Sequence, residues 1–292
     1  MPKKLRKFLK SIAMQYPRSA AVYRAIRYGP NTFKPPIMTP MGFKFSGSQA
    51  ILNGNYEPDE TRLVQKLLPE IDCLINIGAN IGYYTCMALH KNKPVIAFEP
   101  IELNFKYLLG NIFSNNFQST VELFPLALSN KPGIVEIFGG GSGASLIKGW
   151  AGTAEDFSCL VPCSTLDLIL GNRFTTEQLL IIVDIEGAEK KMLDCATQLI
   201  NMDPKPLWLI EINGAINQPS GIKMNPYLLE TFEKFWSRGY EAVMAGKDFH
   251  LITWEEIQRS AETAIDIDGS HNFLFFDKSL KPKINQIYQK LK

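Results

Sequence analysis

The sequence contains no apolar run of the ~18 residues that a membrane-spanning helix requires. The chain begins with several lysines and arginines. The stretch that follows is interrupted by Gln15, Arg18, Arg24 and Arg27, so it does not have the apolar centre of a signal peptide. We therefore expect a cytoplasmic protein.

Cysteines are few and form no framework. The five are odd in number and scattered, and most stand in apolar runs, which favours free buried thiols in a reducing compartment: Cys73, Cys86, Cys159, Cys163 and Cys195. Only Cys159 and Cys163 are closely spaced. Because no second pair and no neighbouring histidine accompanies them, we expect no zinc site there, and no other ligand spacing singles out a metal site.

An excess of charge of either sign is also absent. Lysine and arginine total 31 against 29 for aspartate and glutamate, so we expect no nucleic-acid partner. With 46% hydrophobic and 21% charged residues, the composition is that of a globular protein with a sizeable core. We find no internal repeat.

The N-terminal residues have a helical pattern of their own. Apolar residues recur at helical spacing among cations up to about residue 30, which predicts one or two amphipathic helices. These helices could cap the main domain, form a homodimer, or contact anionic lipid peripherally at the inner membrane surface. A proline-rich arm follows at 29–42. We predict an extension over 1–50, a catalytic domain over 51–280 and a tail over 281–292, the tail being a solvated or loosely packed helix.

From residue 57 onward short apolar runs alternate with helical segments. This alternation predicts βαβ units and a parallel sheet with helices on both faces. The expected strands are 73–77, 95–98, 121–126, 179–183, 207–212, one near Ala242, and 271–276; the expected helices are 58–68, 82–90, 103–113, 188–200 and 226–238. Two further strands, 134–138 and 160–163, flank a glycine-rich loop at 139–143 and indicate an inserted hairpin or lid, although flexible glycines are equally consistent with disorder.

The strand at 73–77 runs straight into a glycine turn. Gly78 and Gly82 lie four apart, and glycine permits both a tight reversal and the close approach of a ligand to the backbone. Free backbone N–H groups at the start of the next helix suit the carboxylate of a methionine moiety as well as a phosphate. A purely structural turn is the alternative interpretation.

Glu99 follows the next parallel strand directly, so its carboxylate can accept hydrogen bonds from both hydroxyls of a ribose. That placement suits a nicotinamide cofactor and S-adenosylmethionine alike. Asn80 occupies the middle position of the turn, where its side chain would crowd a diphosphate, and this favours S-adenosylmethionine.

Carboxylates also follow the strand at 179–183. Alternation along the chain puts Asp184 and Glu186 on the same side at the carboxyl edge of the sheet. Alternatively, Glu186 and Glu189 only favour the N-terminus of the next helix, an effect of about 0.3 to 1 kcal/mol. Glu211 is a third carboxylate at this edge.

Four motifs in this order resemble the FkbM family of methyltransferases: residues 76–82, Phe98-Glu99-Pro100 with Asn104 and Leu108 behind it, residues 165–167, and residues 184–189. The resemblance implies a Rossmann-like class I sheet with an antiparallel last strand, S-adenosyl-L-methionine as the donor, and O-methylation, often of sugar or polyketide hydroxyls. Two positions depart from the family. Asn76 stands where aspartate is usual, and Ile182 stands where many members carry lysine.

The expected roles follow from the turn, the edge carboxylates and this resemblance. A general base would speed transfer from a hydroxyl, and the candidates are Asp184, Glu186 and His271, although His271 could simply face solvent. Tyr83 and Tyr84 either enclose the donor or belong to the core, and Thr165 caps a short helix that holds Asp167. The expected cofactor-binding residues are Asn76, Gly78, Ala79, Asn80, Gly82, Tyr83, Tyr84, Glu99, Pro100 and Asp184.

Two other functions remain open from the sequence. Asn76 and Ile182 also fit a catalytically silent binding module with a methyltransferase fold. A nicotinamide-dependent oxidoreductase is the third option, and Asn80 argues against it. The acceptor, whether a small molecule or a glycan hydroxyl, is set by loops whose conformation the sequence does not reveal.

Overall fold

The computed structural model describes residues 35–154, 156–246, 248–267 and 271–291. The helices expected within residues 1 to about 30 lie outside the described residues. In the arm that follows, β1 (Ile37–Met38) and β2 (Lys44–Phe45) pair as a short antiparallel hairpin ahead of α3 (Gln49–Leu52). Phe43, Phe45 and Ile51 are buried in the main core, so this core already includes side chains before the predicted boundary at residue 51.

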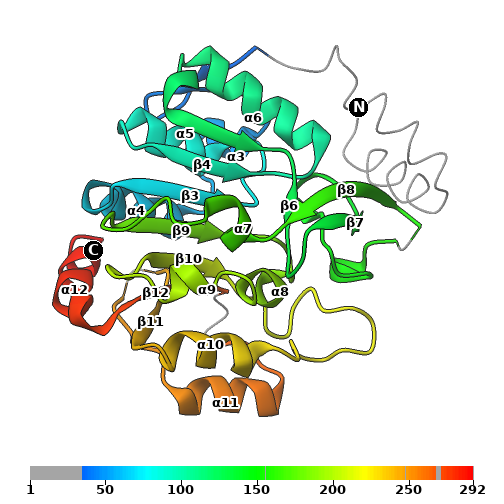
Figure 1. The fold of residues 1–292 in the computed structure, drawn as a ribbon, viewed down its shortest axis with the longest axis vertical. Coiled ribbons are helices and arrows are strands. Elements are labelled where there is room, and N and C mark those ends of the chain that lie inside the picture. The colour runs from blue at the N-terminus through cyan, green and yellow to red at the C-terminus, as the bar shows by residue number, and fades with distance from the viewer. Residues whose placement is uncertain (1–34, 155, 247, 268–270, 292) are drawn as a thin grey trace.

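A seven-stranded sheet forms the centre of the molecule (Figure 1). Its order is β11-β12-β10-β9-β3-β4-β5, with the bounds β3 (Cys73–Ile77), β4 (Val95–Phe98), β5 (Val121–Phe124), β9 (Leu179–Val183), β10 (Leu207–Glu211), β11 (Tyr240–Met244) and β12 (Asn272–Asp277). Within this sheet β12 runs opposite to the other six strands, which share one direction. The expected Rossmann-like class I fold with an antiparallel last strand is confirmed.

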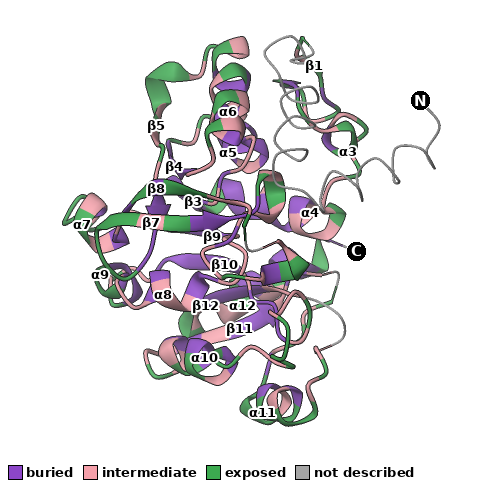
Figure 2. Ribbon diagram, turned by 90° about the vertical axis from the view of Figure 1, so that its right-hand side faces the viewer, coloured by how far each residue is buried: buried purple, intermediate pink, exposed green. Residues whose placement is uncertain are grey.

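Helices cover both faces of this sheet, and alternate residues of each strand point to opposite faces. Leu74, Leu180 and Leu209 pack on one side with α4 (Pro58–Leu67), α5 (Tyr83–His90), α6 (Glu102–Ser114) and α12 (Lys281–Gln289). Ile75, Ile181 and Trp208 pack on the other side with α7 (Leu166–Leu170), α8 (Glu189–Leu193), α9 (Thr197–Ile200), α10 (Leu228–Trp236) and α11 (Trp254–Thr263). Figure 2 shows the resulting buried centre.

The expected hairpin is confirmed as a separate small sheet beside the main one (Figure 1). It consists of β6 (Ala127–Leu128), β7 (Gly133–Phe138) and β8 (Ser158–Ser164), and β7 pairs antiparallel with β8. The glycine-rich segment between β7 and β8 contains two single 3₁₀ turns, Gly141–Gly143 and Trp150–Gly152.

Two expectations about helices are wrong. The helix expected at 188–200 is broken into α8 and α9, because the carboxylate of Asp167 accepts hydrogen bonds from Thr197 N (2.8 Å) and Gln198 N (3.2 Å) and so provides α9 with its own N-terminal cap. The C-terminal helix is not loosely packed. Ile284, Ile287 and Tyr288 of α12 are buried in the core beside α4.

Candidate active site

The register of the sheet brings the predicted residues to one edge. Ile77 pairs with Phe98 on one side and with Val183 on the other, and Val183 pairs with Ile210. The residues that follow these positions therefore start from one level at the carboxyl edge of the sheet: Gly78, Glu99, Asp184 and Glu211.

The glycine turn folds back onto the neighbouring strands. Gly78 N and Ala79 N both donate to Phe98 O, at 3.0 and 2.8 Å, and Asp184 N donates to Ile77 O at 3.0 Å. Gly78 has φ +80°, and a Cβ placed on it would lie 1.8 Å from Asp184 O. Gly78 is therefore required by the protein's own backbone, in addition to any ligand that lies over the turn.

Glycine is required at position 82 for a different reason. A Cβ on Gly82 would lie 2.4 Å from Leu108 Cδ1 on α6, and Gly82 lines neither cavity described below. It serves the packing of α6 on the turn. Its predicted contact with the cofactor stays a prediction that the geometry does not favour.

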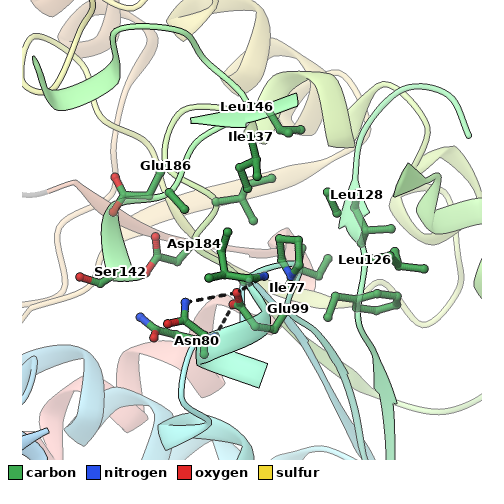
Figure 3. A pocket seen from close by; sticks show the side chains of 18 of the residues that line it. Ile77, Asn80, Glu99, Leu126, Leu128, Ile137, Ser142, Leu146, Asp184 and Glu186 are labelled. Carbon is green, nitrogen blue, oxygen red and sulfur yellow. Dashed lines mark hydrogen bonds between the residues drawn. The ribbon is translucent and has the colours of Figure 1, made fainter. Parts of the chain in front are cut away.

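Glu99 points back to the turn (Figure 3). It is 4% exposed; its Oε2 accepts from Asn80 N at 2.8 Å, and its Oε1 accepts from Ile101 N at 2.8 Å and from Asn104 Nδ2 at 3.2 Å. Burial raises the pKa of Glu99 to about 7, although all three hydrogen bonds favour the charged form. The same Asn104 amide donates to Gly141 O at 3.0 Å and so ties the loop after β7 to Glu99.

An apolar slot opens beside Glu99. Its lining includes Ile77, Phe98, Pro100, Leu126 and Leu128 (Figure 3). A second, larger cavity of about 730 Å³ adjoins the slot, and the two share Gly78, Asn80 and Asp184 in their linings. Cavities of about 300 to 1,000 Å³ are the size that binds small molecules.

Most of the predicted cofactor residues line one of the two cavities, and several also have structural partners. Asn76 is 3% exposed and donates from Nδ2 to Thr85 Oγ1 at 3.0 Å. Tyr83 is largely core, whereas the hydroxyl of Tyr84 donates to Glu57 Oε2 at 2.7 Å. The lining of the large cavity includes these three residues as well as Ala79 and Ile182.

Asp184 lies at the junction of the two cavities. Its Oδ1 is buried, and no N–H or O–H group of the described residues donates to it. Burial, followed by the charges of Glu211 and Glu186, raises the pKa of Asp184 well above its usual range, and the carboxyl of Glu211 is close enough to share a hydrogen bond with it. The carboxyl group of Asp184 therefore has a second carboxyl group, that of Glu211, as its neighbour at the junction.

Glu186 and His271 are placed less favourably for catalysis. Glu186 Oε2 accepts a hydrogen bond from the buried Trp150 Nε1 at 2.7 Å, and its backbone carbonyl accepts one from Ser145 Oγ at 2.5 Å, so the residue anchors the segment after β7. His271 lines neither cavity, and its backbone carbonyl accepts from Ile212 N. The next residue, Asn272, is the one that lines the large cavity.

The sequence interpretation missed an acidic wall at the start of α4. Glu57 and Glu60 line the large cavity, and Asn272 Nδ2 donates to Glu60 Oε1 at 3.1 Å. Burial is the main reason why the pKa of each glutamate is raised. No local pattern marks these two residues, because glutamates in the first turn of a helix are ordinary.

Two kinds of feature are absent from the described ranges, a metal-binding cluster and a membrane-spanning helix. Within them no group of three or more histidine, cysteine, aspartate or glutamate side chains is arranged to hold a metal ion. None of the helices there is long and apolar enough to cross a bilayer. The five cysteines are free, and Cys159 is exposed, contrary to the expectation of burial.

The family model of the methyltransferase FkbM domain matches residues 76–242, more than half of the chain. The chain belongs to the FkbM methyltransferase family. The glycine turn, Glu99 and the strands β4, β5, β9 and β10 lie within the matched part, β3 and β11 overlap its two ends, and β12 lies beyond it. The matched domain is a methyltransferase domain, and the family implies a methyl donor of the S-adenosylmethionine type.

Solved structures similar to this FkbM chain are methyltransferases of several kinds. One is an FkbM methyltransferase from Methylobacillus flagellatus KT, with 19% identity and a TM-score of 0.44, over 71% of this chain and 44% of that one. A putative O-methyltransferase from Klebsiella pneumoniae has 10% identity and a TM-score of 0.37, over 75% of this chain and 79% of that one. Precorrin-6y C5,15-methyltransferase from Geobacter metallireducens GS-15 has 10% identity and a TM-score of 0.41, over 82% of this chain and 97% of that one. The chain thus matches less than half the length of the Methylobacillus protein. No curated protein matches it.

Proposed function

We propose that this FkbM protein transfers a methyl group from S-adenosyl-L-methionine to a hydroxyl of a sugar, a glycan or a related natural product. The observation that carries the proposal is the position of Glu99. Its carboxylate lies at the glycine turn and lines an apolar slot that adjoins an acidic cavity.

The residues at the turn fit the donor. Glu99 Oε2 accepts only the hydrogen bond of Asn80 N among the described residues, so a lone pair remains for one ribose hydroxyl. Glu99 Oε1 already accepts two hydrogen bonds, and a second hydroxyl would displace the longer one from Asn104. Ile77, Phe98 and Leu128 provide the apolar walls that a flat nucleobase requires.

The large cavity provides the place for the acceptor. When bound, S-adenosylmethionine supplies an electrophilic methyl group on a sulfonium, and much of the acceleration comes from holding the acceptor oxygen in line with it. In such a transfer the C–S bond of the donor would break as the new C–O bond forms, and its electron pair would remain on sulfur. Asp184, with the carboxyl of Glu211 beside it, would take the hydroxyl proton as the base.

The donor site is tested by binding. Calorimetry with S-adenosylmethionine and S-adenosylhomocysteine, and a mass measurement for S-adenosylhomocysteine that co-purifies with the protein, should both give a positive result. Absent binding contradicts the proposed function. Binding without turnover across neutral, cationic and anionic hydroxyl acceptors would favour a silent binding module instead.

Replacing Glu99 should weaken donor binding. Glu99→Ala removes the acceptor for a ribose hydroxyl, and the loss of one charge-assisted hydrogen bond is about 1.5 to 3 kcal/mol, or roughly 10- to 150-fold in the dissociation constant of S-adenosylhomocysteine. Glu122→Ala removes an exposed carboxylate from the neighbouring strand β5 and should leave this constant unchanged. An unchanged constant in Glu99→Ala would exclude Glu99 from the donor site.

Donor binding should also depend on pH. Because the pKa of Glu99 is raised to about 7, the carboxyl becomes protonated below neutrality and loses an acceptor for the ribose. The affinity for S-adenosylhomocysteine should fall by up to about tenfold per pH unit below pH 7 and level off above it. In Glu99→Ala the part of this pH dependence that comes from the Glu99 carboxyl should disappear.

The effect of the same group on stability has the opposite sign. An acid whose pKa is raised on folding stabilises the fold below its ordinary value of 4.5, and this contribution is lost as the pH rises to about 7. Binding and unfolding measured over the same pH range therefore separate the two effects.

A further inference from the structure

The large cavity has acidic walls without a basic side chain. Its charged lining residues are Glu57, Glu60, Glu102, Asp184 and Glu211, and no lysine, arginine or histidine of the described residues is among the lining residues. Glu102 forms an ion pair with Lys106. The other four have no such ion pair within the described ranges.

These four carboxyl groups lie close enough to affect one another. The charge of Glu211 raises the pKa of Glu57, Glu60 and Asp184, and the charge of Glu57 adds to the effect on Asp184. Like charges that converge on one cavity repel one another, and a bound cation relieves this repulsion. The cavity therefore suits a positively charged ligand.

One observation independent of the charge count also indicates a ligand. The buried Oδ1 of Asp184 has no donor from the described residues, although it lies at a cavity large enough for a small molecule. Glu57 lies in the wall of the same cavity. Tyr84 holds its carboxylate through the hydrogen bond of 2.7 Å.

The donor alone does not balance this charge. S-adenosylmethionine carries a sulfonium, an ammonium and a carboxylate, so its net charge is a single positive one, whereas Glu57 and Glu60 line the cavity in addition to Asp184 and Glu211. We infer that the acceptor is a hydroxyl compound that also carries an ammonium group, as an amino sugar does. Glu57 and Glu60 hold the ammonium, and the hydroxyl faces Asp184 and Glu211. This inference rests on the proposed function.

The same charges act against anionic acceptors. A phosphate on the acceptor would be brought next to several carboxylates in a site that excludes much of the solvent, and like-charge contacts of this kind cost several kcal/mol. Phosphorylated and nucleotide-linked sugars are therefore poor acceptors for this chain. Among compounds with the same sugar ring, charge is the property that this cavity distinguishes.

The experiment compares three sugars with the full chain saturated with S-adenosylhomocysteine. Calorimetry with glucosamine, N-acetylglucosamine and glucose 6-phosphate should show glucosamine binding at least about tenfold more tightly than N-acetylglucosamine, because the charge-assisted bond is lost on acetylation. Glucose 6-phosphate should not bind. The affinity for glucosamine should fall as the salt concentration rises.

Matched variants locate the ammonium. Glu57→Gln and Glu60→Gln remove one charge each but keep an oxygen for Tyr84 or Asn272, and each should weaken glucosamine binding about tenfold. Glu233→Gln removes an exposed charge from α10 and should have no effect.

The outcomes are separable from those for the donor site. Binding of N-acetylglucosamine or glucose 6-phosphate as tight as that of glucosamine overturns the inference, and so does a failure of glucosamine to bind. S-adenosylhomocysteine is titrated first in the same experiment. Its failure to bind would instead overturn the proposed function.

Discussion

Asp184→Asn should lower the turnover number by about 10² to 10⁴-fold, the contribution of a general base. Asparagine has nearly the same size, so the side chain still fits the junction of the two cavities. It cannot take a proton from the acceptor hydroxyl, and it removes the carboxyl group that stands next to Glu211. The measurement is the rate of S-adenosylhomocysteine formation at saturating donor, together with the unfolding temperature.

Glu186→Gln is the matched comparison, because it changes the other predicted carboxylate two residues away. The glutamine oxygen can still accept the hydrogen bond of Trp150 Nε1, so the segment after β7 stays anchored. We expect turnover within about twofold of the unmodified protein, since the hydrogen bond that holds residue 186 is kept. If Glu186→Gln were the inactive variant and Asp184→Asn the active one, the assignment of the base would be reversed.

Gly78→Ala should abolish donor binding and destabilise the protein by several kcal/mol. The added Cβ would lie 1.8 Å from Asp184 O, so either the turn or the end of β9 must move, and both carry the site. The left-handed backbone at φ +80° adds a further cost of about 1 to 2 kcal/mol. Calorimetric titration with S-adenosylhomocysteine and chemical denaturation measure the two effects.

Gly152→Ala separates the collision from the backbone cost. Gly152 also has a positive φ, +68°, but a Cβ there would meet nothing within 4 Å. This variant should lose about 1 to 2 kcal/mol of stability and keep its affinity for S-adenosylhomocysteine. Equal effects of the two variants would mean that the contact with Asp184 O does not constrain the turn.

The central strands could be predicted from the sequence because their physics is local. The runs at 73–77, 95–98 and 179–183 are buried on both faces and are apolar except for Asn76. The break between α8 and α9 could not be predicted, since the cap comes from Asp167, which lies 30 residues earlier than Thr197. The packing of α12 was also hidden, because an amphipathic terminal helix looks alike whether it covers α4 or faces water.

Some residues of the candidate site could likewise be predicted from the sequence, and others could not. Glu99 and Asp184 directly follow parallel strands, so register alone brings them to one edge of the sheet. The packing of Gly82 could not be predicted, because its neighbour Leu108 comes from a helix whose packing the sequence does not specify. Glu57 and Glu60 were missed for the same reason: only the tertiary fold brings the start of α4 over the ends of β9 and β10.

Helix α12 packs against α4, the helix at whose start the acidic wall of Glu57 and Glu60 lies. Ile284 and Tyr288 of α12 pack in the same core as Leu63 and Leu67 of α4, the helix that begins directly after Glu57 and contains Glu60. Removing α12 should therefore weaken discrimination among acceptors, although no residue of α12 lines the large cavity. The proposed selectivity would therefore depend on packing contacts outside the cavity.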